Sequence, residues 1–159
     1  MKPANRDRPS VLFVCLGNIC RSPLAEAAFR EEAARAGLVA DGDSAGTGNW
    51  HVGEPPDVRA LRTARGHGVD ISGHRGRQVE AADFRTFTHI LALDRDNLAD
   101  LRRLAPADAT ARLGLLLDLV PGRAGEAVAD PYFGDEAGFE TTWNDVAAAA
   151  QALVAMLKR

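Results

Sequence analysis

The chain has 159 residues, of which 46% are hydrophobic and 26% are charged. This length and balance are typical of one globular domain with a substantial core, and they exclude a disordered tail, a fibre or a disulfide-rich scaffold. The formal net charge of -3, from 19 basic and 22 acidic residues, gives no reason to expect binding to nucleic acid or to an anionic membrane surface.

The cysteine content and the N-terminal residues indicate the cellular compartment of the protein. Cys15 and Cys20 are the only cysteines, too few for a secreted disulfide framework or a zinc site. Residues 1–9 are polar and lack a signal-peptide core, so they predict a flexible extension ahead of a domain spanning 10–159. Since no run approaches the roughly 18 apolar residues needed to cross a bilayer, we expect a cytoplasmic protein with no membrane partner.

Four short apolar runs predict buried strands, at residues 11–15, 38–44, 88–93 and 115–120. They are continuously apolar rather than alternating, which is typical of strands in a parallel sheet covered on both faces. Helical patterns lie between them. This alternation predicts right-handed βαβ units and a single doubly wound α/β domain.

Capping residues and apolar spacing predict the helices. The first has Ser22 as its N-cap and ends before Gly37, and a second spans Val58 to about Gly66. A third follows Asp94 as its N-cap. The last carries an apolar stripe with alternating steps of four and three residues, typical of one buried face: Phe139, Trp143, Val146, Ala150, Leu153 and Leu157. We assign Phe139 and Trp143, together with Phe84, to the core.

The loop after the first predicted strand carries the chemistry, because ligands in doubly wound folds bind beyond the carboxyl ends of strands. It reads Cys15-Leu16-Gly17-Asn18-Ile19-Cys20-Arg21-Ser22-Pro23. A short loop entering a helix can aim its backbone N–H groups at one anion, and Arg21 adds a guanidinium fork suited to two phosphate oxygens. Such surroundings favour the thiolate of Cys15, which predicts a nucleophile for phosphoryl transfer.

This loop resembles the phosphate loop of the low-molecular-weight protein tyrosine phosphatases. The resemblance extends over about residues 10–158 and includes the segments 44–50, 74–77, 94–97 and 130–134. It implies a central four-stranded parallel sheet of order 2-1-3-4 flanked by helices. It also implies that phosphate is held by Leu16, Gly17, Asn18, Ile19, Cys20, Arg21 and Ser22.

The resemblance gives roles to three residues outside that loop. Asp130 would otherwise be read only as part of an Asp-Pro turn signal, and it corresponds to the family's general acid. After a phosphocysteine forms, the same carboxylate would act as base toward water. Trp50 and Tyr132 correspond to the aromatic residues that wall the substrate entrance and select a flat aryl ring.

The resemblance also implies a supporting network and shows two departures. Ser44 and His74 correspond to residues that hold Asn18 in a left-handed conformation and so shape the phosphate loop. Phe133 stands where the family often has a second tyrosine, which leaves one tyrosine in the chain. Gly76 stands where alanine or serine is commoner.

The implied function is hydrolysis of phosphotyrosine proteins or small aryl phosphates by a monomer that needs no metal or other cofactor. Three alternatives stay open. An arsenate reductase on the same fold would relay a disulfide through later cysteines, but none follows Cys20. Phosphoarginine phosphatases of this kind carry threonine at the position of Ile19. A phosphopeptide-binding module would need neither thiolate nor acid. A protective Cys15–Cys20 disulfide is a further hypothesis.

Overall fold

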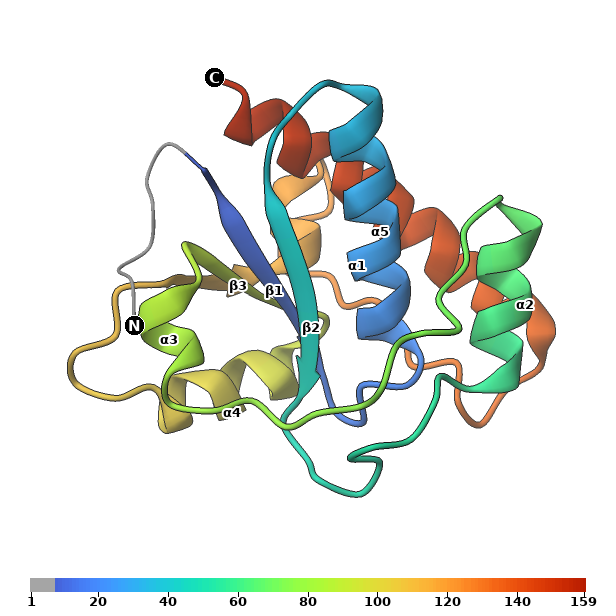
Figure 1. The fold of residues 1–159 in the computed structure, drawn as a ribbon, viewed down its shortest axis with the longest axis horizontal. Coiled ribbons are helices and arrows are strands. Elements are labelled where there is room, and N and C mark those ends of the chain that lie inside the picture. Colours follow the sequence, from blue (N-terminus) through green and yellow to red (C-terminus); the bar gives the residue numbers. More distant parts are fainter. Residues whose placement is uncertain (1–7) are drawn as a thin grey trace.

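The computed structural model describes residues 8–159, which form a four-stranded parallel sheet with helices on both faces (Figure 1). The strand order is β2-β1-β3-β4. The strands are β1 (Ser10–Cys15), β2 (Asp41–Gly46), β3 (His89–Ala92) and β4 (Arg112–Leu115). The predicted fold class and the implied strand order are confirmed.

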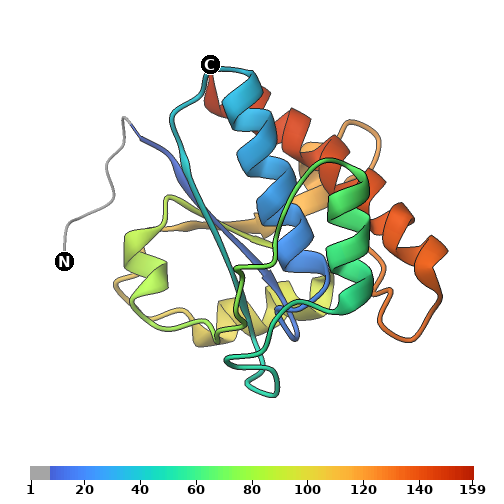
Figure 2. The same cartoon turned by 45° about the vertical axis from the view of Figure 1, so that its right-hand side comes forward.

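The helices divide into two layers, as Figure 1 and the turned view of Figure 2 show. One layer covers one face of the sheet, with α1 and α5 packed against each other. It consists of α1 (Arg21–Arg35), α2 (Val58–Gly66) and α5 (Glu136–Leu157). The other layer consists of α3 (Asp83–Thr86) and α4 (Arg95–Leu104). No helix within residues 8–159 is both long and apolar enough to cross a membrane.

The position of β1 inside the sheet, between two layers of helices, explains why residues 11–15 are all apolar. Val11, Phe13 and Cys15 belong to the core cluster beneath α1 and α5, whereas Leu12 and Val14 belong to the cluster on the opposite face. Successive side chains of a strand point to opposite faces, so a strand buried on both sides has no polar face. The last residue of this strand is Cys15, which therefore lies at the carboxyl edge of the sheet.

Two strand predictions are wrong in their bounds. The second strand begins at Asp41 rather than at residue 38. Its polar sequence forms a strand because it pairs along β1, from Ser10 with Asp41 to Cys15 with Gly46, and such pairing overrides local preference. The fourth strand ends at Leu115, and the apolar run continues as the 3-10 helix η1 (Leu116–Leu119). Apolar runs alone do not separate a strand from a buried helical turn.

The start of α1 also differs from the prediction. The helix begins at Arg21 with Cys20 at the N-cap position, so Ser22 is not its N-cap. Pro23 still lies in the first turn, where its missing N–H leaves no hydrogen bond unmade. At the other end Gly37 adopts φ 71°, and its N–H and that of Leu38 close the helix on Ala34 and Ala33.

The remaining helix predictions are confirmed. Helix α2 spans Val58–Gly66, and the Asp94 carboxylate caps α4 by accepting the N–H of Asn97. The stripe of α5 is buried at Phe139, Trp143, Val146, Ala150 and Leu153, and Leu157 is half-buried. Phe84 is also in the core.

Most of the extension predicted for residues 1–9 lies outside the described residues. Of the two described members, Arg8 forms an ion pair with Asp41 at 2.7 Å, and the Pro9 carbonyl accepts the Asp41 N–H. The chain is therefore tied to the start of β2 before β1 begins.

Candidate active site

A cavity of about 180 Å³ lies at the carboxyl edge of the sheet, within the loop that joins β1 to α1. Its lining brings together two segments that are more than 100 residues apart in the sequence. These are the whole of residues 15–21 on one side and Asp130, Tyr132 and Phe133 on the other, with His51 completing the wall. The predicted nucleophile, phosphate-binding arginine and general acid thus face one space.

Cys15 sits at the floor of this cavity with two polar partners. The Asn18 backbone N–H donates to its Sγ at 3.3 Å, and the Ser22 Oγ lies 2.9 Å from the same sulfur. The Ser22 oxygen already accepts a hydrogen bond from the Asn18 side-chain amide at 2.9 Å. Because that contact occupies the oxygen as acceptor, the Ser22 hydroxyl proton is free to point at Cys15, so two hydrogen-bond donors can face the sulfur.

Asn18 is fully buried and has φ 59°, the only positive φ at a non-glycine residue within 8–159. Four polar contacts hold its side-chain amide and its backbone carbonyl. Its side-chain amide donates to Ser22 and to Ser44 at 2.9 and 3.0 Å, its Oδ1 accepts the Arg77 N–H at 2.9 Å, and its carbonyl lies 2.9 Å from His74 Nε2. The structure therefore places Ser44 and His74 around Asn18, as the resemblance implies.

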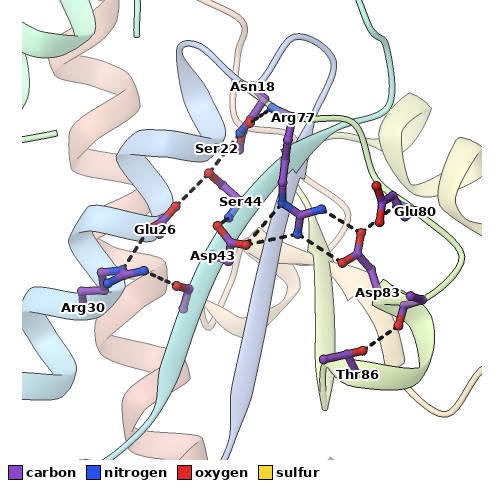
Figure 3. Close-up of polar contacts among 12 residues, drawn as sticks. Asn18, Ser22, Glu26, Arg30, Asp43, Ser44, Arg77, Glu80, Asp83 and Thr86 are labelled. Carbon is purple, nitrogen blue, oxygen red and sulfur yellow. Dashed lines mark hydrogen bonds and ion pairs between the residues drawn. The ribbon is translucent and has the colours of Figure 1, made fainter. Parts of the chain in front are cut away.

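This network continues away from the cavity in two directions (Figure 3). Toward α1, the Ser44 hydroxyl donates to Glu26 at 2.8 Å, and Arg30 pairs with the same carboxylate at 2.9 Å. Burial raises the pKa of Glu26, although the hydrogen bond from Ser44 acts in the opposite direction. The other branch runs through Arg77, whose backbone N–H bonds Asn18.

The Arg77 guanidinium lies between two carboxylates that belong to different elements (Figure 3). It contacts Asp43 of β2 at 3.1 Å and Asp83 of α3 at 3.0 Å. The carbonyl of Arg77 accepts the Gly46 N–H at the end of β2. The backbone N–H that holds Asn18 is therefore fixed at a rigid junction of strand and helix.

Arg21 is the buried cation of the site, with only 4% of its side chain exposed. Its Nη1 donates to Asp94 at 2.7 Å and to the Val128 carbonyl at 2.9 Å, and its Nη2 lies 3.7 Å from Asp130. Burial alone lowers the pKa of Arg21, but Cys15, Asp94 and Asp130 raise it above its usual value. Sequence reasoning identified Asp94 only as a helix cap and missed this second contact.

Asp130 reaches the cavity from an irregular segment that follows Val128. The Val128 N–H donates to the Leu93 carbonyl, which anchors the segment beside the end of β3. The Asp130 Oδ1 accepts the Tyr132 N–H at 3.0 Å, and 43% of its side chain remains exposed. A carboxyl group in this position faces both the cavity and solvent, so it can exchange protons with water.

The two predicted entrance residues lie differently. Tyr132 lines the cavity, whereas the Trp50 indole packs over Gly48 and is 68% exposed. His51 lines the wall instead, and its ring tilts against that of Tyr132 at 6.4 Å. No sequence signal separated His51 from its neighbour, because both lie in one glycine-rich loop.

Gly76 allows this loop to approach the phosphate loop closely. A Cβ at position 76 would lie 2.3 Å from the His51 carbonyl, a distance no side chain tolerates. The Gly76 N–H donates to the Glu54 carbonyl at 2.8 Å, and Gly53 donates back to Gly76 at the same distance. Glycine at position 76, where the family more often has alanine or serine, therefore leaves room for the His51 backbone at this place.

Cys20 differs from Cys15 in its surroundings. Burial and the negative charge of Asp57 raise the pKa of Cys20 well above its usual range. Both cysteines are free thiols in the structure, so the hypothetical Cys15–Cys20 disulfide is not formed. Within residues 8–159, no group of three His, Cys, Asp or Glu side chains is arranged to hold a metal ion.

Fold and cavity together define a class: a single-domain α/β phosphatase with a cysteine in its phosphate loop. Comparison with known proteins makes the class specific. The family model "Low molecular weight phosphotyrosine protein phosphatase" matches residues 10–159. The protein of that name from Schizosaccharomyces pombe is 44% identical over 132 residues, covering 81% of this chain and 84% of the relative.

Solved structures agree with this match. A protein tyrosine phosphatase from Entamoeba histolytica superimposes with a TM-score of 0.89 at 33% identity, covering 94% of this chain and 97% of that one. A Drosophila arginine phosphatase also gives 0.89, at 32% identity and with 94% and 98% coverage. The chain belongs to the low-molecular-weight phosphotyrosine protein phosphatase family, which confirms the resemblance and the predicted enzyme class.

Iodoacetate at neutral pH should modify Cys15 and leave Cys20 unmodified. The thiolate is the reactive form, and burial keeps Cys20 as a thiol. Mass spectrometry of a digest should locate one carboxymethyl group, and inorganic phosphate should slow its attachment by occupying the loop. Equal modification of the two cysteines would contradict the difference in their surroundings.

Proposed function

We propose that the chain hydrolyses phosphotyrosine in proteins, and small aryl phosphates, through a phosphocysteine intermediate. One observation carries the proposal: Cys15, Arg21 and Asp130 line a single cavity together with residues 16–20 of the loop between them. A nucleophile, a fixed cation and a proton donor are the three groups that phosphoryl transfer from an aryl ester requires.

The reaction follows from these positions. The Cys15 thiolate attacks phosphorus while the bond from phosphorus to the aryl oxygen breaks, and Asp130 gives its proton to the departing oxygen. Loop N–H groups and the Arg21 guanidinium stabilise the charge on the equatorial oxygens. Asp130, now a carboxylate, takes a proton from water, whose oxygen attacks phosphorus, breaks the phosphorus–sulfur bond and releases inorganic phosphate.

Selectivity for an aryl ester depends on the cavity wall. Tyr132 and His51 stand on the same rim with their rings 6.4 Å apart, and we propose that they flank the aromatic ring of the substrate. Trp50 is exposed and next to His51 in the chain, and we propose that it contacts residues that neighbour the phosphotyrosine. A short phosphoserine side chain would not carry its phosphate to Cys15 past these walls.

Every group in this scheme comes from one chain, so we propose that a monomer is the active form. Light scattering of the purified protein should give the monomer mass of 16.9 kDa. A dimer at assay concentration would overturn this point. We also propose a cytoplasmic location, because two cysteines are too few for the disulfide framework of a secreted domain.

Peptides that differ only in the phosphorylated residue test the substrate class. We expect phosphotyrosine peptides to be hydrolysed fastest, with phosphoarginine and phosphoserine peptides far behind. Cys15→Ser should still bind the phosphotyrosine peptide but release no phosphate, because a hydroxyl is a much weaker nucleophile. Faster release from phosphoarginine would overturn the proposal, and binding without turnover by the unchanged chain would indicate a phosphopeptide-binding module.

Asp130→Asn should remove the proton donor and keep the shape of the segment. General acid catalysis contributes about 10²–10⁴-fold, and its loss is felt most when the departing oxygen is strongly basic. We therefore expect kcat for phenyl phosphate to fall by about that factor, and kcat for p-nitrophenyl phosphate to fall much less. Equal losses on the two substrates would contradict the role of Asp130 as acid.

A further inference from the structure

Arg59 in the first turn of α2 connects the two halves of the cavity. On one side its guanidinium meets the carboxylate of Asp57 through two parallel contacts, Nε to Oδ1 and Nη2 to Oδ2, both 3.0 Å. The Asp57 backbone N–H donates to the Ile19 carbonyl at 2.9 Å, within the phosphate loop. Arg59 is thus fixed to the segment that carries the nucleophile.

On its other side Arg59 reaches the segment that carries the general acid. Its Nη2 donates to the Tyr132 carbonyl at 2.8 Å and its Nη1 to the Gly134 carbonyl at 2.9 Å. Within residues 8–159, these two are the only hydrogen bonds that join residues 130–134 to another element. Arg59 therefore supplies both of the hydrogen bonds that tie this segment to the rest of the fold, in addition to the 3.7 Å contact of Arg21 with Asp130 and the burial of Pro131.

Two aromatic rings complete the contact. The Arg59 guanidinium lies 4.6 Å from the centroid of Phe139, which is fully buried in α5, and 5.7 Å from that of Tyr132. A guanidinium over an aromatic face is held electrostatically as well as by packing. The rings fix the plane of the fork, so its hydrogen bonds point in a defined direction.

We propose that Arg59 is a positioning residue that holds Asp130 and Tyr132 in register with Cys15. The inference rests on the proposed phosphatase function, since it assigns Asp130 the part of general acid. Asp130 is two residues from the anchored Tyr132 carbonyl and accepts the Tyr132 N–H, so a shift of this segment moves the carboxyl group directly. Proton transfer to the departing oxygen is sensitive to displacements of about 1 Å.

Lysine does not replace arginine in this arrangement. Arg59 uses donors on three nitrogens to meet one carboxylate and two carbonyls, and an ammonium group has neither that spread nor a planar face for the rings. If Arg59 acted through its charge alone, Arg59→Lys would keep wild-type activity. Because the geometry of the guanidinium is what matters, we expect Arg59→Lys to lose as much activity as Arg59→Gln.

The test compares Arg59→Gln with Arg62→Gln, a matched change one turn along α2. Arg62 is exposed and pairs with Glu136 outside the cavity. We expect Arg59→Gln to lower kcat for phenyl phosphate by about 10–100-fold and kcat for p-nitrophenyl phosphate by much less, with Arg62→Gln near wild type on both. In the Asp130→Asn background, Arg59→Gln should lower kcat for phenyl phosphate little further, because both changes remove the same proton transfer from Asp130.

A second readout does not depend on activity. Hydrogen exchange of residues 130–134 should be faster in Arg59→Gln than in the wild type and unchanged in Arg62→Gln. If Arg59→Gln folds poorly, Asp57→Asn takes its place, because asparagine is also a good helix cap. Asp57→Asn should change the kcat values and the hydrogen exchange in the same direction as expected for Arg59→Gln. Equal losses on both substrates, or unchanged exchange in a folded variant, would overturn the inference. A wild type inactive on both substrates would overturn the proposed function alone, and exchange would still decide the role of Arg59.

Discussion

The site depends on one buried amide. Asn18 holds a left-handed backbone conformation that side chains rarely adopt, and a short loop keeps such a conformation only when its surroundings fix it. Ser22, Ser44 and Arg77 use both ends of its side chain, so burial leaves no polar atom of the amide unpaired. Because the turn at Asn18 is fixed, its N–H points at Cys15 and the loop closes around one centre.

The overall charge of the chain says little about this centre, because the field that matters is local. A net charge of -3 gives no reason to expect an anion as ligand. Yet Arg21 is buried and held by Asp94, the Val128 carbonyl and the nearby Asp130, which keep a cation where burial alone would disfavour it. Backbone N–H groups add positive charge without adding a charged residue.

The sequence predicted those parts of the structure that local chemistry determines. A buried strand, a loop and a helix start are encoded side by side around Cys15, so the fold class and the phosphate loop could be read directly. The strand at Asp41 and the short β4 depend on pairing across the sheet, which no local pattern contains. His51 and Arg59 act through contacts with distant segments, which no local pattern contains either.

The two halves of the site are held in different ways, and the chemistry accounts for the difference. The loop of the proposed nucleophile is tied into the buried network between β2 and α1, which shields and fixes it. The proposed acid must exchange protons with water and must leave room for an aryl ring, which agrees with the 43% exposure of the Asp130 side chain. A segment this exposed gains alignment from an anchor that is fixed in the rigid half of the site. Arg59 is such an anchor, since Asp57 ties it to Ile19 and Phe139 ties it to the core.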